Sequence, residues 1–272
     1  MPDAAQINAN VGTNTSTRDI RMFRLEGLPD FQPGDGLAER LIQHLENTGT
    51  TLVDKDILVI AHKVVSKCEG AVRRLSEVTP SAEAVEVAES VGKDPRKVQV
   101  ILDQSKRILR AVRHHPEREG VLIAEHNRGY ICANAAVDES NSAEADLLIT
   151  LPDNPDRSAR ELADALEHHF GVTLGIVISD TFGRPWRLGQ TNVAIGVANV
   201  PALNVMAGET DAYGRPLTVT APALGDELAA ASGLLMEKSA QTPVIVFRGL
   251  DWQVTNSSGQ DLIRAQQEDL FR

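Results

Sequence analysis

The chain has 272 residues, of which 42% are hydrophobic and 24% are charged, a composition typical of a folded globular protein. Its formal net charge of −11 disfavours binding to nucleic acids or anionic membranes, because phosphate polymers would be repelled. No apolar run reaches the roughly 18–20 residues that a membrane-spanning helix needs. The polar segment 1–19 lacks the pattern of a secretion signal. We therefore expect a cytoplasmic protein with a disordered N-terminal tail over residues 1–19.

Short β-branched blocks alternate with amphipathic stretches along the rest of the chain. The predicted strands are rich in Val, Ile and Leu and cover 56–61, 121–124, 129–133, 147–151, 174–179, 193–197, 217–220 and 244–248. Some neighbouring strands are spaced as hairpins, and others are separated by helices. This order predicts an α+β fold with two mixed subdomains within residues 20–272, whose boundary the composition does not reveal.

Four helices are predicted from acidic capping residues followed by apolar residues at helical spacing. They are expected to begin at Asp35, at Asp94 followed by Pro95, at Asp156, and at Asp226. A glycine is expected to end the third helix at Gly171, and the fourth is predicted to run to Lys238.

Common phosphate-binding and hydrolase motifs are absent from the sequence: it has no GxxxxGK[ST] or GxGxxG loop, no HExxH and no GxSxG. Neither Cys68 nor Cys132 has a CxxC partner, so we interpret both as structural thiols in a reducing compartment. A nucleotide-dependent enzyme with this sequence would need a different scaffold.

The densest polar cluster spans 179–192, directly after the most hydrophobic predicted strand. Asp180 and Thr181 offer the oxygen ligands that Mg²⁺ or Mn²⁺ prefers. Arg184 and Arg187 are three residues apart and suit the recognition of phosphate or carboxylate. The alternative is a polar turn in which Trp186 packs into the core and the arginines form surface ion pairs.

Two further clusters each allow a functional and a structural interpretation. In segment 133–141, Asp138 and Asn141 follow small residues, which suits a carboxylate turned toward a metal or an ordinary hairpin turn. In segment 64–70, Lys67 follows hydrophobic residues that we interpret as a strand. Such a lysine either neutralises phosphate oxygens or is simply solvated.

Taken together, these clusters resemble the coenzyme F420-0:L-glutamate ligases, the CofE family. The resemblance keeps its order from about residue 20 to the C-terminus. It is carried by segments 27–35, 64–70, 138–141, 151–159, 179–192, 225–229 and 243–249.

The resemblance implies a GTP-dependent ligation of glutamate, through its amine, to the terminal carboxylate of the deazaflavin precursor F420-0. In such a reaction the carboxylate first takes the γ-phosphate, giving an acyl phosphate and GDP, and the amine of L-glutamate then displaces phosphate. Two divalent cations (Mg²⁺ or Mn²⁺) and K⁺ are associated with such enzymes. The resemblance also implies a fold of two α+β subdomains in an intertwined homodimer. No protein nucleophile is required, which agrees with the absence of a catalytic triad.

Carried onto this sequence, the resemblance assigns Asp138 and Asp180 to a first metal and Thr181 to a second, with Lys67 meeting phosphate. The GTP site is expected to comprise Leu28, Pro29, Asp30, Phe31, His62, Lys67 and Asn141. We add Arg184 and Arg187 as candidate contacts for the acidic groups of F420-0 or glutamate. For Asp226, a helix cap is favoured over a third metal carboxylate.

The sequence departs from the family pattern at a few positions. His62 stands where a small hydroxyl residue is more usual, Ala136 replaces a usual glycine, and segment 236–241 is less rich in glycine. These departures make the expected nucleotide contact of His62 less specific than the others, and we assign no nucleotide contact to segment 236–241.

Two alternative functions are compatible with the same residues. A ligase of the same scaffold would add glutamate to another small carboxylic acid, and only the acceptor pocket would distinguish it. A GTP- or metabolite-binding regulator would bind without turnover, although pure binding does not need two metal carboxylates, a hydroxyl ligand and a phosphate lysine together.

Overall fold

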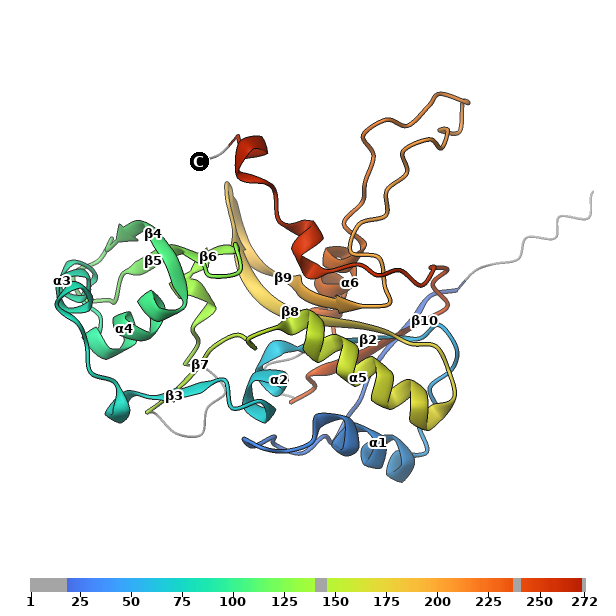
Figure 1. Cartoon of the computed structure of the whole chain (residues 1–272), viewed down its shortest axis with the longest axis horizontal. Helices are drawn as coiled ribbons and strands as arrows, with labels where there is room; N and C mark the ends of the chain where they lie inside the picture. Colours follow the sequence, from blue (N-terminus) through green and yellow to red (C-terminus); the bar gives the residue numbers. More distant parts are fainter. Residues whose placement is uncertain (1–18, 140–145, 237–240, 271–272) are drawn as a thin grey trace, which may run out of the picture.

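A computed structural model describes residues 19–139, 146–236 and 241–270 of the chain (Figure 1). A five-stranded sheet runs through its centre in the order β1-β10-β2-β8-β9. Its strands are β1 (Arg21–Arg24), β2 (Ile57–Ala61), β8 (Gly175–Arg184), β9 (Arg187–Ala198) and β10 (Val244–Arg248). β2 and β8 pair in parallel, and every other neighbouring pair in this sheet is antiparallel.

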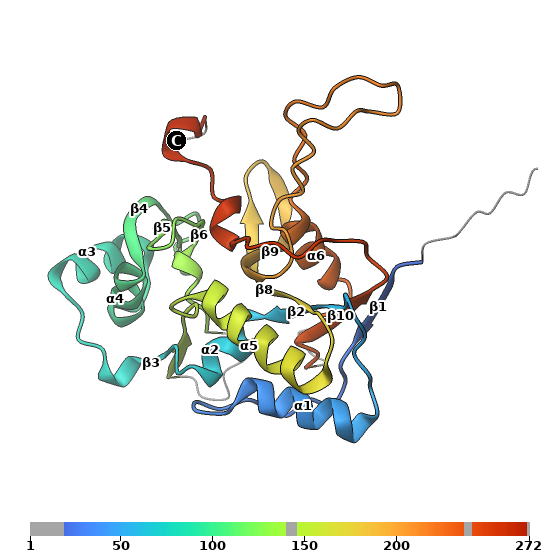
Figure 2. The same cartoon turned by 45° about the vertical axis from the view of Figure 1, so that its right-hand side comes forward.

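Helices cover both faces of the central sheet. On one face α1 (Leu37–Thr48) and α5 (Pro155–Phe170) lie side by side (Figure 2), and α6 (Leu224–Ser232) packs on the other. Side chains alternate accordingly along β2, because successive residues of a strand point to opposite faces. Leu58 and Ile60 belong to the core beneath α1 and α5, whereas Ile57 and Val59 join the core beneath α6.

A second group of elements has a hydrophobic core of its own. The strands β4 (Ser105–Val112), β5 (Val121–His126) and β6 (Ile131–Ala133) form an antiparallel sheet, and α3 (Ala82–Val91) and α4 (Pro95–Asp103) pack against it. The α+β class is thus confirmed, while the division into two subdomains and the homodimer stay predictions.

Shorter elements complete the described chain. β3 (Val72–Arg74) pairs with β7 (Leu147–Ile149), and α2 (His62–Cys68) follows β2 directly. Short 3₁₀ turns cover 75–77, 134–136, 259–262 and 266–268. Within the described ranges, no helix is both long and apolar enough to cross a membrane.

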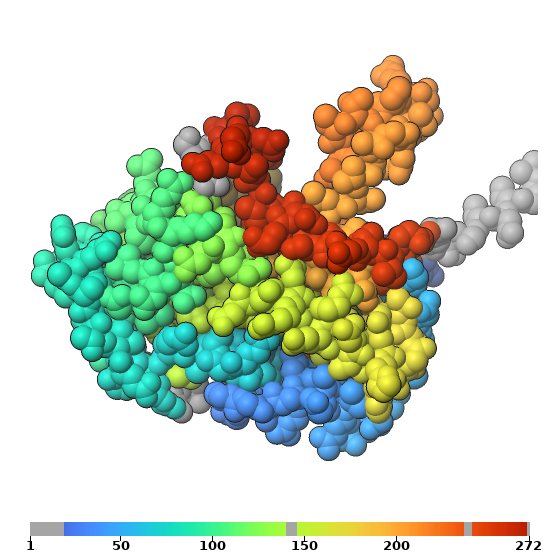
Figure 3. Space-filling model, viewed as in Figure 1, coloured from blue at the N-terminus to red at the C-terminus, as the bar shows by residue number. Residues whose placement is uncertain are grey.

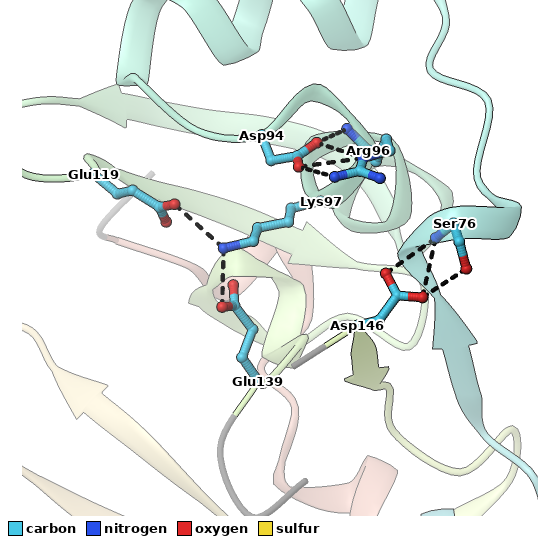
Figure 4. Close-up of polar contacts among 7 residues, drawn as sticks. All are labelled: Ser76, Asp94, Arg96, Lys97, Glu119, Glu139 and Asp146. Carbon is cyan, nitrogen blue, oxygen red and sulfur yellow. Dashed lines mark hydrogen bonds and ion pairs between the residues drawn. The ribbon is translucent and has the colours of Figure 1, made fainter. Parts of the chain in front are cut away.

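Charged contacts tie α4 to its surroundings (Figure 4). The Asp94 carboxylate accepts a hydrogen bond from the backbone N–H of Arg96 at 2.8 Å, so the predicted cap of this helix is confirmed. Lys97 Nζ lies 3.3 Å from Glu119 and 2.9 Å from Glu139. The second of these ion pairs holds the residue next to Asp138 against α4.

The other three acidic residues expected to cap helices have different roles. α1 begins after Gly36, and the Asp35 carboxylate pairs with Arg40 at 2.8 Å, a hydrogen bond that lowers the pKa of this aspartate. Asn154 caps α5 in place of Asp156.

Asp156 and Asp226 instead bind the backbone of β9. The Asp156 carboxylate accepts hydrogen bonds from the N–H groups of Val197 and Gly259, and that of Asp226 accepts one from Ala194, at 2.7–2.9 Å. α6 begins at Leu224 and ends at Ser232, well before the predicted end at Lys238. The sequence pattern correctly predicted that these two carboxylates lie near the start of a helix. Their hydrogen-bond partners, however, come from a distant strand rather than from the helix itself.

Two other predictions from sequence are wrong. Segment 64–70 is not the end of a strand but lies largely in α2. Segment 217–220 forms no strand; it belongs to residues 203–222, which stand out from the body as a long loop (orange in Figure 3). The seven other predicted strands are confirmed in position, whereas β1, β3, β4, α2 and α3 were not predicted.

A bulge interrupts the pairing of β8 with β9. Ile178 is opposite Gly196 and Ser179 is opposite Ala194, so Ile195 has no partner across the ladder. The hydroxyl of Tyr130 donates a hydrogen bond to the Ile195 carbonyl at 2.6 Å. This bond satisfies a carbonyl group that the bulge leaves outside the regular ladder.

An ion pair with one buried partner joins the neighbouring inner strands β2 and β10 of the central sheet. Asp56 is fully buried at the start of β2, and the guanidinium of Arg248 at the end of β10 binds both of its carboxylate oxygens, at 2.8 and 2.7 Å. One of these oxygens also accepts the backbone N–H of Val53 at 2.9 Å. Removing the charge of a buried partner leaves the other group uncompensated.

We expect Asp56→Asn to lower the free energy of unfolding by about 3 kcal/mol. The matched control is Arg157→Gln, which breaks the exposed Arg157–Glu161 pair and should change stability by no more than about 0.5 kcal/mol. Denaturant unfolding followed by circular dichroism measures both variants. Equal midpoints for Asp56→Asn and the wild type would contradict the structural role of the buried pair.

Candidate active site

A cavity of about 640 Å³ opens where the parallel pairing of β2 with β8 ends, at Ala61 and Ser179. The start of α2, the ribbon of β8 and β9, the loop after β1, the end of α6 and the residues before β10 border it. Its lining residues are Pro29, Asp30, Phe31, Ala61, His62, Lys63, Val64, Lys67, Ser179, Asp180, Thr181, Gln190, Asn192, Gly233, Met236, Gln241, Thr242 and Pro243.

Two lysines of α2 line this cavity. Lys63 and Lys67 are four residues apart, so they lie on the same side of the helix. The ammonium of Lys67 is 2.8 Å from a carboxylate oxygen of Asp30, and that of Lys63 is 2.6 Å from one of Asp138. Sequence reasoning found Lys67 but missed Lys63. Reading segment 62–68 as a helix would have revealed the pair by its spacing.

The Asp180 carboxylate has one restrained oxygen. Its Oδ1 accepts the backbone N–H of Thr181 at 2.6 Å and lies 3.1 Å from Nε2 of His62. Among the described residues, no hydrogen-bond donor contacts its Oδ2. The Thr181 hydroxyl donates to Oδ1 of Asn192 at 2.8 Å. The cavity wall therefore presents a fixed carboxylate next to an oriented hydroxyl.

His62 is 2% exposed and lies behind this carboxylate. Its Nδ1 is 3.2 Å from the Ser66 hydroxyl, and its Nε2 is close to Asp180 without the alignment of a full hydrogen bond. The structure thus places His62 where it supports Asp180 and also borders the cavity. Its predicted contact with nucleotide stays a prediction.

Asp138 does not line the cavity itself but is joined to it through Lys63. The turn before it has positive φ angles at Asn134, Ala135 and Ala136, the last at +57°. This left-handed backbone favours glycine, which explains why glycine suits position 136 in the family pattern. Three parts of the sequence predictions lie outside the described residues: Asn141, residues 237–240 of segment 236–241, and residues 1–18 of the predicted tail.

The remaining predicted residues fall into two groups. Pro29, Asp30 and Phe31 line the cavity, whereas Leu28 is a core residue with 6% exposure. Arg184 and Arg187 are exposed where β8 turns into β9, away from the cavity lining. The interpretation of Trp186 as a core residue is wrong, since its side chain is 81% exposed.

A metal would have to be held here by few protein ligands. Across the described ranges, no cluster of three or more His, Cys, Asp and Glu side chains is arranged to hold a metal ion. Mg²⁺, however, is commonly bound by one or two carboxylates together with substrate phosphates and water. Asp180 with its uncontacted oxygen, beside Thr181, fits that mode of binding.

Cys132 lies in the core behind the site, and both cysteines are free thiols. Burial, helped by the charge of Asp180, raises the pKa of Cys132 to about 12, and burial also raises that of Cys68 to about 11. At pH 8 only about one Cys132 in ten thousand would be a thiolate, against a substantial fraction for a free cysteine.

We therefore expect Cys132 to be alkylated by iodoacetamide at pH 8 at least about a hundred times more slowly in the folded protein than after denaturation. Mass spectrometry of the labelled peptides measures both rates. Rapid labelling of the folded protein would contradict both the burial of this thiol and its raised pKa.

Two kinds of comparison with known proteins find matches for this chain. The sequence model described as F420-0:Gamma-glutamyl ligase matches residues 27–249. The coenzyme F420:L-glutamate ligase of Methanopyrus kandleri is 44% identical over 92% of this chain and 98% of its own length. The ligases of the same name from Methanothermobacter thermautotrophicus and Methanocaldococcus jannaschii are 41% and 40% identical, over 93% and 94% of this chain and 99% and 98% of their own. This chain therefore belongs to the F420-0:gamma-glutamyl ligase family and is a ligase.

Proposed function

We propose that this ligase uses GTP to join L-glutamate to F420-0 through a γ-linkage, by way of an acyl phosphate, and releases GDP and phosphate. One observation supports the proposal above the others. Two lysines of one helix and the Asp180–Thr181 pair border a single cavity of about 640 Å³. Phosphoryl transfer requires positive side chains and a metal site around the phosphate groups, because the protein's main part is to position the reactants and neutralise their charge.

The lysines are suited to the nucleotide phosphates. When a triphosphate enters, the ammonium groups of Lys63 and Lys67 would exchange the Asp138 and Asp30 carboxylates for phosphate oxygens. The loop of Pro29, Asp30 and Phe31 would then contact the nucleotide at the cavity rim. This exchange frees Asp138 for a cation at the same step.

In this proposal Asp138, Asp180 and Thr181 hold two divalent cations, Mg²⁺ or Mn²⁺, and K⁺ is a further cofactor. Bound there, the cations would neutralise phosphate oxygens during transfer. The part of the protein is to keep Asp180 in place, through the Thr181 N–H and the His62 contact. Arg184 and Arg187 remain proposed contacts for acidic groups of the substrates.

We also propose that the enzyme works as a homodimer in the cytoplasm. Large apolar side chains are exposed on the protruding loop 203–222, with Val205, Tyr213 and Val219 between 63% and 90% exposed. Apolar groups held away from the body in this way suit contact with a second chain.

Incubating purified protein with F420-0, L-glutamate, GTP, Mn²⁺ and K⁺ tests the reaction. We expect mass spectrometry to detect glutamyl additions in step with GDP release, and chelation of the metal to abolish both. GDP release without glutamylation would indicate another acceptor acid. GTP binding without either product would favour a regulator.

Asp180→Asn tests the role of the carboxylate with an isosteric change. The amide oxygen can still accept the Thr181 N–H, so the fold should survive, but the loss of the charge should lower kcat by about 100-fold or more. The control is Asp164→Asn, an exposed position on α5 that should retain wild-type kcat. Unchanged turnover in Asp180→Asn would refute the metal assignment.

A further inference from the structure

A second pocket, of about 700 Å³, lies on the other side of the ribbon of β8 and β9. Its walls are the outer face of the β4–β5–β6 sheet, the ribbon itself and the C-terminal segment 262–269. That segment crosses the surface beside the three-stranded sheet (red beside green in Figure 3). We call it the arginine pocket, after Arg107, Arg110 and Arg264 in its lining.

Two of its three guanidinium groups are available to a ligand. Arg107 pairs with Glu125 at 3.0 Å. Among the described residues, by contrast, neither the Arg110 nor the Arg264 side chain has a hydrogen-bond or ion-pair partner. Two carboxylates also border the pocket: Asp226 accepts the Ala194 N–H at 2.9 Å, and Asp269 has a partner of its own. In a chain with net charge −11, two unpaired guanidinium groups in one pocket favour an anionic ligand.

Aromatic and aliphatic side chains form the rest of the walls. Tyr130 and Phe182 face each other edge to face, with ring centroids 6.0 Å apart, and the exposed ring of Trp186 borders the pocket. The Tyr130 ring is held in place by its hydroxyl bond to Ile195. Flat apolar walls beside guanidinium groups suit a planar aromatic molecule with acidic substituents.

The arginine pocket and the cavity share one structural element. Thr181 lines the cavity and Phe182, the next residue, lines the pocket; on β9, Asn192 and Val193 are divided in the same way. A ligand in the pocket therefore lies across a single two-stranded ribbon from Thr181 and Asn192, while Asp180, two residues before Phe182 on β8, is on the pocket's face of that ribbon. An acidic group reaching past that ribbon would arrive at the candidate phosphoryl-transfer site.

We propose that the arginine pocket binds the acceptor substrate, with Arg110 and Arg264 holding its acidic groups and Phe182 and Tyr130 packing against its aromatic ring. The assignment rests on the proposed function, in which the acceptor is a deazaflavin with an acidic tail. Of the other two substrates, L-glutamate has no ring to use the aromatic walls. GTP is aromatic and anionic, but the cavity with its two lysines already provides a nucleotide site.

The test compares steady-state kinetics of the wild type with Arg110→Gln/Arg264→Gln. Both arginines are exposed and unpaired within the described structure, so the double variant should keep the wild-type melting temperature. We expect the KM for F420-0 to rise by about 10-fold or more, because two charge-assisted contacts are lost, while the KM for GTP changes by less than about 2-fold. Arg118→Gln, an exposed arginine outside the pocket, is the matched control and should leave both values unchanged.

A second variant tests the aromatic wall independently of charge. Phe182→Leu keeps an apolar side chain on the ribbon and should weaken direct binding of F420-0, measured by fluorescence titration without GTP, by about 3-fold or more. An unchanged KM for F420-0 in the double variant, with normal wild-type turnover, would overturn the pocket assignment alone. Failure of the wild type to glutamylate F420-0 would instead overturn the proposed function on which the assignment rests.

Discussion

The site depends on one pairing: the parallel alignment of β2 with β8. Because the two strands run in the same direction, their continuations leave the sheet at the same edge. A short helix with two lysines comes directly after β2, and an aspartate and a threonine come directly after the paired part of β8. Two lysines and the Asp180–Thr181 pair, more than a hundred residues apart in sequence, thereby face one cavity.

Ion pairs between lysines and carboxylates lie at the cavity on this edge of the sheet. The protein as a whole is strongly acidic, and the lysines at the cavity are paired with carboxylates, Lys63 with Asp138 and Lys67 with Asp30. Such pairs offset the positive charge of the lysines, and in the proposed function they are exchanged for phosphate oxygens of the nucleotide. The net charge of −11 repels polyanions in general, while the two lysines provide local positive charge at the cavity.

Sequence reasoning succeeded where a signal is local. Alternating hydrophobic blocks revealed seven strands, and Asp94 capped its helix as predicted because its partner is two residues away. It failed where partners are distant. Asp156 and Asp226 have the composition of caps, but each binds backbone of β9, which no local pattern encodes. Lys63 was missed because its importance depends on α2 being a helix, and seven residues are too few to show a clear periodicity.

The bulge at Ile195 has a consequence for how this family can vary. In a ribbon, adding or removing one residue turns every later side chain to the opposite face. The single extra residue on β9 sets which face Asn192 and Val193 occupy, and the hydroxyl of Tyr130, in the turn between β5 and β6, holds it in place. Between the bulge and the hairpin tip, insertions and deletions should therefore be tolerated only when they add or remove an even number of residues, because this keeps each side chain on its face of the ribbon. The tip itself is free to change length, so evolution can reshape the end of the ribbon while the order of its faces stays fixed.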